Sequence, residues 1–178
     1  EYLQVAWVRM CQVLEQDFTP YLQVCLPRMI KQAQAEADVA VLDADAEDEQ
    51  AQYDENEWDF ADINGRRYGI HTACLEEKCV ALENIAAIAG TMGAAFAPFC
   101  QDCLFTLAVP LLEFDLHDGV ECAAADLVSA CIKSMAAANP TTAQQAAVQC
   151  LGKLIETAKS KYSPEYTTSA IDAIAVIL

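Results

Sequence analysis

Apolar residues recur with the 3.6-residue period of an α-helix along most of this chain. In the first segment they stand at Leu3, Ala6, Trp7, Met10, Val13 and Leu14. The same period returns in later segments, and no strand-like alternation of apolar and polar residues stands out between them. We therefore predict an all-α fold of seven amphipathic helices, over residues 1–15, 18–34, 72–92, 97–114, 119–135, 141–161 and 164–178.

The predicted helix ends carry residues that start or stop helices. Gly, Pro, Asn or Asp bounds each segment after residue 72. Asp118, Asn139, Thr141 and Ser163 stand at or near predicted starts, where a side-chain oxygen can accept a hydrogen bond from the first turn. These four residues are therefore predicted N-caps.

The chain also repeats itself. The string FTPY at residues 18–21 recurs as FAPF at 96–99, and the Cys-Leu pair at 25–26 recurs at 103–104. Alternate helices are predicted to start 47 and 45 residues apart, near Thr72, Gly119 and Pro164. This period is typical of helix-pair solenoids of the HEAT kind. We expect residues 1–178 to form a single HEAT-repeat α-solenoid of about three helix pairs behind a truncated leading helix.

One stretch departs from the helical pattern. Between Lys31 and Arg66 the sequence holds twelve carboxylates and no lysine or arginine. Its few bulky residues are too scattered to bury a core. Residues 35–68 are therefore predicted to form an acidic, partly flexible insert between the two helices of one repeat. A dense negative segment on a rigid scaffold suits the capture of a basic partner, and the alternative is that it only keeps a loop soluble.

The overall charge supports the same class of partner. The formal net charge is −17, with only ten lysines and arginines in 178 residues, which argues against nucleic acid or an anionic membrane surface as a direct ligand. No uninterrupted apolar run approaches the roughly 20 residues that a membrane span needs. Basic proteins or peptides fit this balance better.

Candidate catalytic and metal-binding groups are sparse. The nine cysteines are odd in number and fall among apolar residues of predicted helices, as Cys79 and Cys131 do, so we expect free thiols. Cys100 and Cys103 form a lone C-x-x-C, which could be a redox pair or half a zinc site, but no second pair follows. A calcium loop starting at Asp43 fails, because it lacks the glycine that an EF-hand requires at its sixth position. We expect no enzyme, cofactor or metal.

Several strings resemble a known family. Glu57-Trp58-Asp59-Phe60, the segment from Gly69 to Lys78, Val109-Pro110-Leu-Leu and His117-Asp118-Gly119-Val120 are similar to karyopherin-β import receptors of the importin-5 (importin beta-3) type. The segment from Pro110 to Leu127 also resembles the HEAT consensus, although Glu121 stands where that consensus has Arg. This departure removes the usual Asp–Arg pair between repeats.

The resemblance implies that the chain is a fragment of a longer nuclear transport receptor. Such receptors bind basic cargo signals and Ran-GTP on an acidic concave surface, touch Phe-Gly nucleoporins and shuttle between cytoplasm and nucleus. The resemblance implies no cofactor, and the charge and composition given above lead us to expect no direct nucleic-acid ligand and no membrane insertion. The alternative is a generic HEAT-repeat scaffold subunit for protein-protein assembly.

The residues predicted to contact basic cargo or Ran lie in the insert. They are Asp43, Asp45, Glu47, Asp48, Glu49, Asp54, Glu55, Glu57, Trp58 and Asp59. Trp58 is expected either to hold a cation on its ring or to pin the insert to the scaffold. Shallow grooves for Phe-Gly segments would lie between neighbouring first helices and be lined by Phe99, Leu104, Phe105 and Leu112, although plain core packing explains these four residues better.

Overall fold

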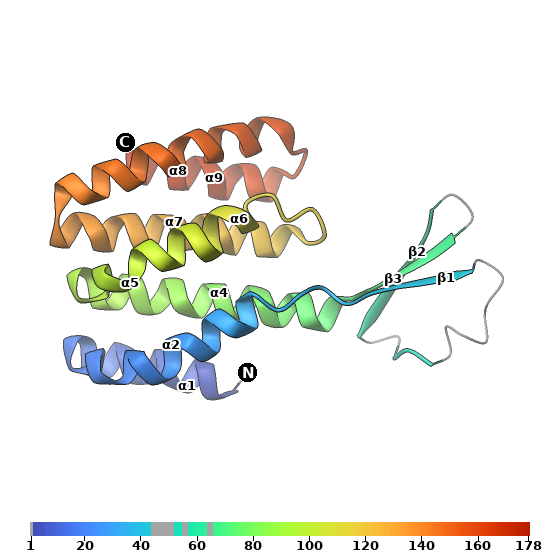
Figure 1. Cartoon of the computed structure of the whole chain (residues 1–178), viewed down its shortest axis with the longest axis horizontal. Helices are drawn as coiled ribbons and strands as arrows, with labels where there is room; N and C mark the ends of the chain where they lie inside the picture. The colour runs from blue at the N-terminus through green and yellow to red at the C-terminus, as the bar shows by residue number, and fades with distance from the viewer. Residues whose placement is uncertain (1, 44–51, 55–56, 64–65) are drawn as a thin grey trace.

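The structure is a computed structural model that describes residues 2–43, 52–54, 57–63 and 66–178 (Figure 1). Its helices are α1 (Tyr2–Leu14), α2 (Thr19–Ala33), α4 (Thr72–Met92), α5 (Ala97–Asp102), α6 (Val109–Leu111), α7 (Asp118–Ala138), α8 (Pro140–Ser160) and α9 (Pro164–Ile177). A π-helical segment, Cys103–Ala108, joins α5 to α6, so residues 97–111 run as one continuous helical rod. The all-α solenoid prediction is confirmed, and the helix bounds match the predicted ones closely.

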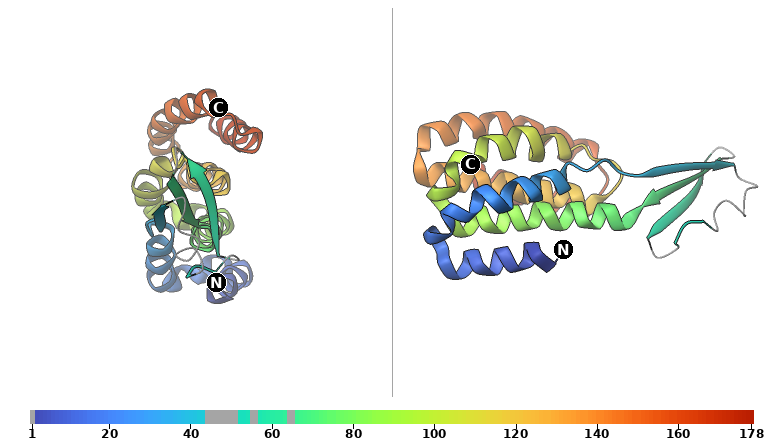
Figure 2. Two further views of the ribbon diagram at one scale, coloured as in Figure 1. Left: turned by 90° about the vertical axis from the view of Figure 1, so that its right-hand side faces the viewer. Right: turned by 60° about the horizontal axis from the view of Figure 1, so that its bottom comes forward.

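The helices form two layers. The inner layer is a row in which α4 packs between α1 and α7, and α7 packs between α4 and α9. The outer layer consists of α2, the α5–α6 rod and α8. Both ends of the array lean toward the side of α1 and α9 in the left view of Figure 2, so the inner layer lines the concave face.

The repeated string has the same structure at both of its sites. Phe18 and Phe96 each end a 3₁₀ turn, Glu15–Phe18 and Gly93–Phe96, and both side chains are fully buried. The aromatic residue three positions later packs on each phenylalanine, with ring centroids 5.6 Å apart at Tyr21 and 5.7 Å apart at Phe99. Gly93 permits the sharp turn after α4 because its φ of 52° lies in the left-handed region that favours glycine.

Two of the four predicted N-caps are confirmed. The Asn139 side-chain oxygen accepts hydrogen bonds from the backbone N–H groups of Thr141 and Thr142, and Ser163 Oγ accepts one from Tyr166. Thr141 is not a cap, because it lies inside α8. Asp118 is not a cap either, because α7 already begins at this residue and His117 takes the N-cap position. The observed start of α7 and its N-cap therefore each lie one residue before the predicted ones.

A continuous apolar core runs between the two layers. All nine cysteines are free thiols, and six of them are buried, Cys131 included. Cys79 is only half-buried: its thiol lies 3.2 Å from the carbonyl oxygen of Gly119 on the neighbouring repeat. The stretch from Thr72 to Leu111 is long and apolar enough to cross a membrane by length and composition alone. In this fold it doubles back at Gly93, and its buried side chains join the core.

The expectation that the chain holds no strands is wrong. The insert contains β1 (Val39–Asp43), β2 (Trp58–Ile63) and β3 (Arg66–His71), which form an antiparallel sheet in the order β1-β3-β2. The period-2 signal is present in Trp58-Asp-Phe60 and Tyr68-Gly-Ile70, but each run is short and interrupted by charges. The ribbon extends beyond the helical body from the N-terminal end of α4 (Figure 1).

Candidate partner-binding surface

The base of the insert is held by contacts between the two helices that flank it. Lys78 of α4 is only 3% exposed and donates a hydrogen bond to the carbonyl oxygen of Ala33 at the end of α2. Its burial lowers the pKa of its ammonium group. The backbone N–H of His71 donates to the carbonyl oxygen of Asp38 over 3.1 Å. The chain therefore enters and leaves the insert at fixed points.

Aromatic rings cover one face of the ribbon. Trp58 stacks on His71 with ring centroids 4.9 Å apart and planes 12° apart, and Tyr53 packs on Trp58 at 4.7 Å. Phe60 lies over Gly69, where a Cβ atom would come within 2.5 Å of the ring. The indole ring of Trp58 already stacks on His71 and is half-buried. This geometry favours a structural role, in which Trp58 anchors the ribbon, over a role as a free ring that binds a cation.

Two carboxylates flank the imidazole of His71. Its Nδ1 lies 3.7 Å from Asp38 Oδ2, and its Nε2 lies 3.6 Å from Glu57 Oε2. The hydroxyl of Thr72 donates to the backbone carbonyl of Glu57 over 3.0 Å. The start of β2 is therefore tied to the first turn of α4, which sets where Glu57 and Trp58 stand.

The structure places half of the predicted insert residues. Asp43 ends β1, Asp54 and Glu57 lie in the turn before β2, and Trp58 and Asp59 begin β2. Glu57 and Trp58 lie together against His71, whereas Asp59 is exposed and faces the opposite side of the strand. Five predicted residues lie outside the described part of the chain: Asp45, Glu47, Asp48, Glu49 and Glu55.

A second group of carboxylates lies in the inner layer, one on each of three successive helices. Glu83 of α4, Asp126 of α7 and Asp172 of α9 are all exposed. Asp126 senses the negative charges of both Glu83 and Asp172, so the three lie along one side of the inner layer, the layer that lines the concave face in Figure 2. We call these three residues the acidic row. Sequence reasoning missed the row, although its members recur 43 and 46 residues apart, close to the repeat length.

The members of the acidic row lie close enough to influence one another. The pKa of Asp126 is raised above its ordinary value, first by partial burial of its carboxyl group and then by the negative charges of Glu83 and Asp172. Because these three carboxylates repel one another, a positively charged ligand bound to the row would relieve that repulsion. Among the described residues no lysine or arginine forms an ion pair with any of the three.

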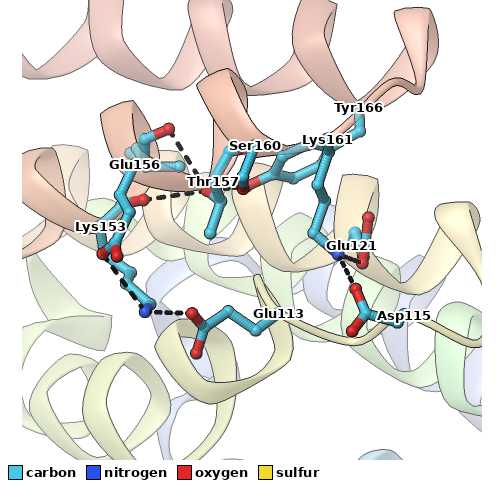
Figure 3. A network of polar contacts seen from close by, with 10 residues as sticks. Glu113, Asp115, Glu121, Lys153, Glu156, Thr157, Ser160, Lys161 and Tyr166 are labelled. Carbon is cyan, nitrogen blue, oxygen red and sulfur yellow. Dashed lines mark hydrogen bonds and ion pairs between the residues drawn. The ribbon is translucent and has the colours of Figure 1, made fainter.

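The position where Glu121 replaces the consensus arginine has its own partner. Glu121 is 2% exposed, and Lys161, from the turn between α8 and α9, forms an ion pair with it (Figure 3). Lys161 Nζ also lies 2.6 Å from Asp115 Oδ1 and 6.0 Å from the centre of the Tyr166 ring. The charges between these repeats are therefore reversed, with the acid on α7 and the base on the following repeat.

An apolar groove lies on the outer layer between α2 and the α5–α6 rod. It has a volume of about 370 Å³ and is lined mainly by Leu22, Leu26, Pro27, Ile30 and Phe99. Of the four residues predicted for such a groove, Phe99 is in it, while Leu104 and Leu112 are fully buried and belong to the core. Phe105 is half-buried against the core and is not among the residues that line the groove. Within the described part of the chain, no cluster of three or more His, Cys, Asp or Glu side chains could hold a metal ion.

Comparison with known proteins gives a consistent result. No family model matches the sequence. The chain is 30% identical over 184 residues to "Importin subunit beta-3" of Saccharomyces cerevisiae, a match that covers 99% of this chain and 17% of that protein. The chain therefore spans about a sixth of the curated relative that it matches.

Solved structures of Kap121p have the same fold over nearly the whole chain. Kap121p bound to RanGTP is 30% identical with a TM-score of 0.86, over 98% of this chain and 17% of that one. A Kap121p variant with three acidic residues replaced by lysine is 29% identical with a TM-score of 0.88, over the same shares. The three replaced residues of that variant lie 43 and 42 positions apart.

Proposed function

Because the chain is, in sequence and in fold, a HEAT-repeat segment of the karyopherin-β kind, similar to importin beta-3, we propose that it forms part of a nuclear transport receptor. Its role there is to bind basic segments of cargo, or Ran-GTP, by charge and without catalysis. The observation that carries this proposal is the acidic row on the concave face. The activity belongs to the longer receptor, which moves between cytoplasm and nucleus.

The acidic row sets the kind of ligand that fits. Neighbouring packed helices have axes about 8–10 Å apart. An extended peptide advances about 3.3 Å per residue. A peptide crossing the inner layer from α4 to α9 would therefore meet successive carboxylates at every third residue. Lysine or arginine at these positions matches Glu83, Asp126 and Asp172 in turn. The three residues replaced by lysine in the Kap121p variant lie 43 and 42 positions apart, and the members of the acidic row lie 43 and 46 positions apart. This similar spacing supports the assignment.

The insert supplies a second negative surface, for which Ran-GTP is the favoured partner. The charge of residues 36–62 attracts a basic protein surface from a distance, and the fixed base of the ribbon limits where that surface can dock. Single exposed ion pairs contribute only about 0.2–1 kcal/mol each, so many must form together and binding should weaken with salt. The structure of Kap121p bound to RanGTP is consistent with this partner.

The groove between α2 and α5 supports a further contact of the receptor. A volume of about 370 Å³ lined by Leu22, Leu26 and Phe99 can accept an aromatic side chain. We assign it to the phenylalanine of a Phe-Gly segment, which would let the receptor touch the nuclear pore from its outer layer. Filling the groove by Leu26→Trp should then weaken binding of a Phe-Gly peptide and leave binding of a basic peptide unchanged.

The decisive experiment measures binding of a lysine-rich peptide to the 178-residue chain by fluorescence anisotropy across a salt series. The variant Glu83→Gln/Asp126→Asn/Asp172→Asn neutralises the acidic row. A matched control, Asp17→Asn/Asp102→Asn/Glu156→Gln, removes the same charge from turns and the outer layer. We expect the first variant to lose at least tenfold in affinity at low salt and the control to lose less than threefold.

Two other outcomes have clear meanings. Equal losses in both variants would show that net charge alone attracts the peptide, and the acidic row would not be the site. No binding by the wild-type chain at low salt would favour the alternative, a generic HEAT-repeat scaffold. Ran-GTP is tested in parallel with Glu57→Gln/Asp59→Asn, which should weaken Ran-GTP binding if the insert serves it.

A further inference from the structure

The ribbon in the insert has an edge that is open to another strand. In the order β1-β3-β2, strand β1 pairs with β3 on one side only. The N–H of His71 donates to the carbonyl oxygen of Asp38, so the Asp38–His71 pair is hydrogen-bonded toward β3. Along one strand of an antiparallel ladder, every second residue forms its backbone hydrogen bonds with a given neighbouring strand. Ala40 and Leu42 therefore also face β3, and the backbone groups of Val39 and Val41 point away from the sheet.

The outward backbone groups of Val39 and Val41 have no partner within the described part of the chain, since no described residue outside the sheet bonds to them. The other edge is different, because the backbone N–H of Trp58 is already bonded to the carbonyl of Asp54 over 3.0 Å. An unpaired edge of this kind is a template for an added strand. Strand β1 therefore offers an edge that a partner can extend from its first residue, whereas the edge of β2 is already occupied at its first residue.

The side chains beside this edge define what would add to it. Val39 and Val41 are 47% and 55% exposed, and their cross-strand neighbours Ile70 and Tyr68 are only partly covered. These four residues form an exposed apolar strip on the face opposite the aromatic cluster. An added strand with apolar side chains at alternate positions would continue the strip and cover it.

Acidic residues flank this edge in sequence. Asp38 is exposed just before β1, and Asp43 is its last residue. Asp59 is exposed on the far side of the apolar strip, in register with Ile70. Asp38 and Asp43 are five residues apart, or about 17 Å along an extended strand. A partner strand with a positive charge at each end of a five-residue span would match both.

We propose that the edge of β1 binds an extended segment of a basic partner by strand addition. The segment carries Lys or Arg opposite Asp43, apolar residues opposite Val41 and Val39, and Lys or Arg opposite Asp38. In an antiparallel arrangement this gives the sequence basic-x-apolar-x-apolar-basic. The inference rests on the proposed function only in taking the partner to be basic, and it adds main-chain pairing as the means of recognition.

N-methylated peptides test the proposal without altering the protein. The parent peptide is acetyl-Lys-Thr-Val-Thr-Ile-Lys-amide. In the added strand, the N–H groups of its third and fifth residues point at β1, while those of its second and fourth residues point to solvent. Methylating the first pair removes two hydrogen bonds and blocks close approach. Methylating the second pair leaves the same charge and the same side chains, so it is the matched control.

Binding is followed by NMR titration of the backbone amides of Val39 and Val41 in the 178-residue chain. We expect methylation at positions three and five to weaken binding at least tenfold, and methylation at positions two and four to change it less than threefold. Equal binding by the two methylated peptides, or no shift of these amides with the parent peptide, would overturn strand addition. The triple variant of the acidic row separates the two sites: it should weaken binding of the lysine-rich peptide on the concave face at least tenfold without changing this titration.

Discussion

The ion pair between Lys161 and Glu121 makes a quantitative prediction about how adjacent repeats hold together. In Lys161→Met the side chain keeps an apolar stem near the Tyr166 ring but loses its charge. Glu121, at 2% exposure, is then left as a buried carboxylate whose charged partner is gone (Figure 3). Such a group must either stay charged without its partner or take up a proton, and both cost folding free energy.

The expected loss of folding free energy follows from how exposed each partner of the ion pair is. Breaking a buried ion pair by removing one partner costs about 3–5 kcal/mol. The Lys161 side chain is 14% exposed and Asp115 is 87% exposed, so the Asp115 contact adds less than about 1 kcal/mol. We expect Lys161→Met to lower the free energy of unfolding by about 3 kcal/mol at pH 7. For a chain of this length, that is a fall in Tm of about 6–12 °C.

The loss should depend on pH in a defined direction. Burial raises the pKa of Glu121, and without Lys161 nothing nearby opposes that effect. When the pKa of a carboxyl group is higher in the folded state than in the unfolded state, the protein keeps its full folding stability below the unfolded pKa. The protein loses that stability as pH rises through the raised folded pKa. The variant should therefore approach the wild type near pH 4 and fall furthest below it at pH 7.

Urea unfolding followed by circular dichroism at pH 4 and pH 7 measures both effects. Glu121→Gln/Lys161→Met should recover much of the loss, because neither partner then carries a charge. Lys153→Met is the control, since its pair with Glu113 lies at the surface, where the Glu113 side chain is 56% exposed, and little change is expected. The reasoning is refuted if Lys161→Met costs less than about 1 kcal/mol at pH 7, if the loss is the same at both pH values, or if the double variant recovers nothing.

Three further predictions concern the insert and the acidic row. Lys78→Met leaves the carbonyl of Ala33 without its buried donor and should destabilise the chain by about 1–3 kcal/mol in urea unfolding; a change within 0.5 kcal/mol, as is usual for a surface site, would contradict this. Gly69→Ala places a Cβ 2.5 Å from the ring of Phe60 and should change the near-ultraviolet circular dichroism of the aromatic cluster, whereas an unchanged spectrum would mean that the ring does not lie there. Binding of a lysine-rich peptide should weaken as pH falls through the raised pKa of Asp126, at a higher pH than an ordinary aspartate would give, and Asp126→Asn should remove that pH dependence.

The helical part of the chain was largely predictable from sequence. Apolar spacing fixed the helices because an amphipathic helix must bury one side. The predicted start and end at Thr72 and Met92 match α4, and the starts at Thr19, Pro140 and Pro164 lie within one residue of those predicted. The strings at 18–21 and 96–99 indicated repetition, and both adopt the same turn because a buried phenylalanine and a proline in the first helical turn recur together.

The secondary structure of the insert was not predictable from the sequence. Its acidity and its place between two helices were evident, but its strands were not. Short runs such as Trp58-Asp-Phe60 carry little periodic signal, and their pairing partners lie up to about thirty residues away in sequence. The sheet exists because Val39–Asp43 and Trp58–Ile63 meet the central strand Arg66–His71, a contact that no local pattern reveals.

The sequence by itself determined the helices, the repeat and the negative charge, since each depends on residues near one another along the chain. Only the tertiary structure decided which charges act together. Glu83, Asp126 and Asp172 form one row because helices one repeat apart pack side by side, and Lys161 meets Glu121 across 40 residues for the same reason. Sequence spacing predicts which face of a helix a side chain occupies, whereas packing between repeats determines which faces meet.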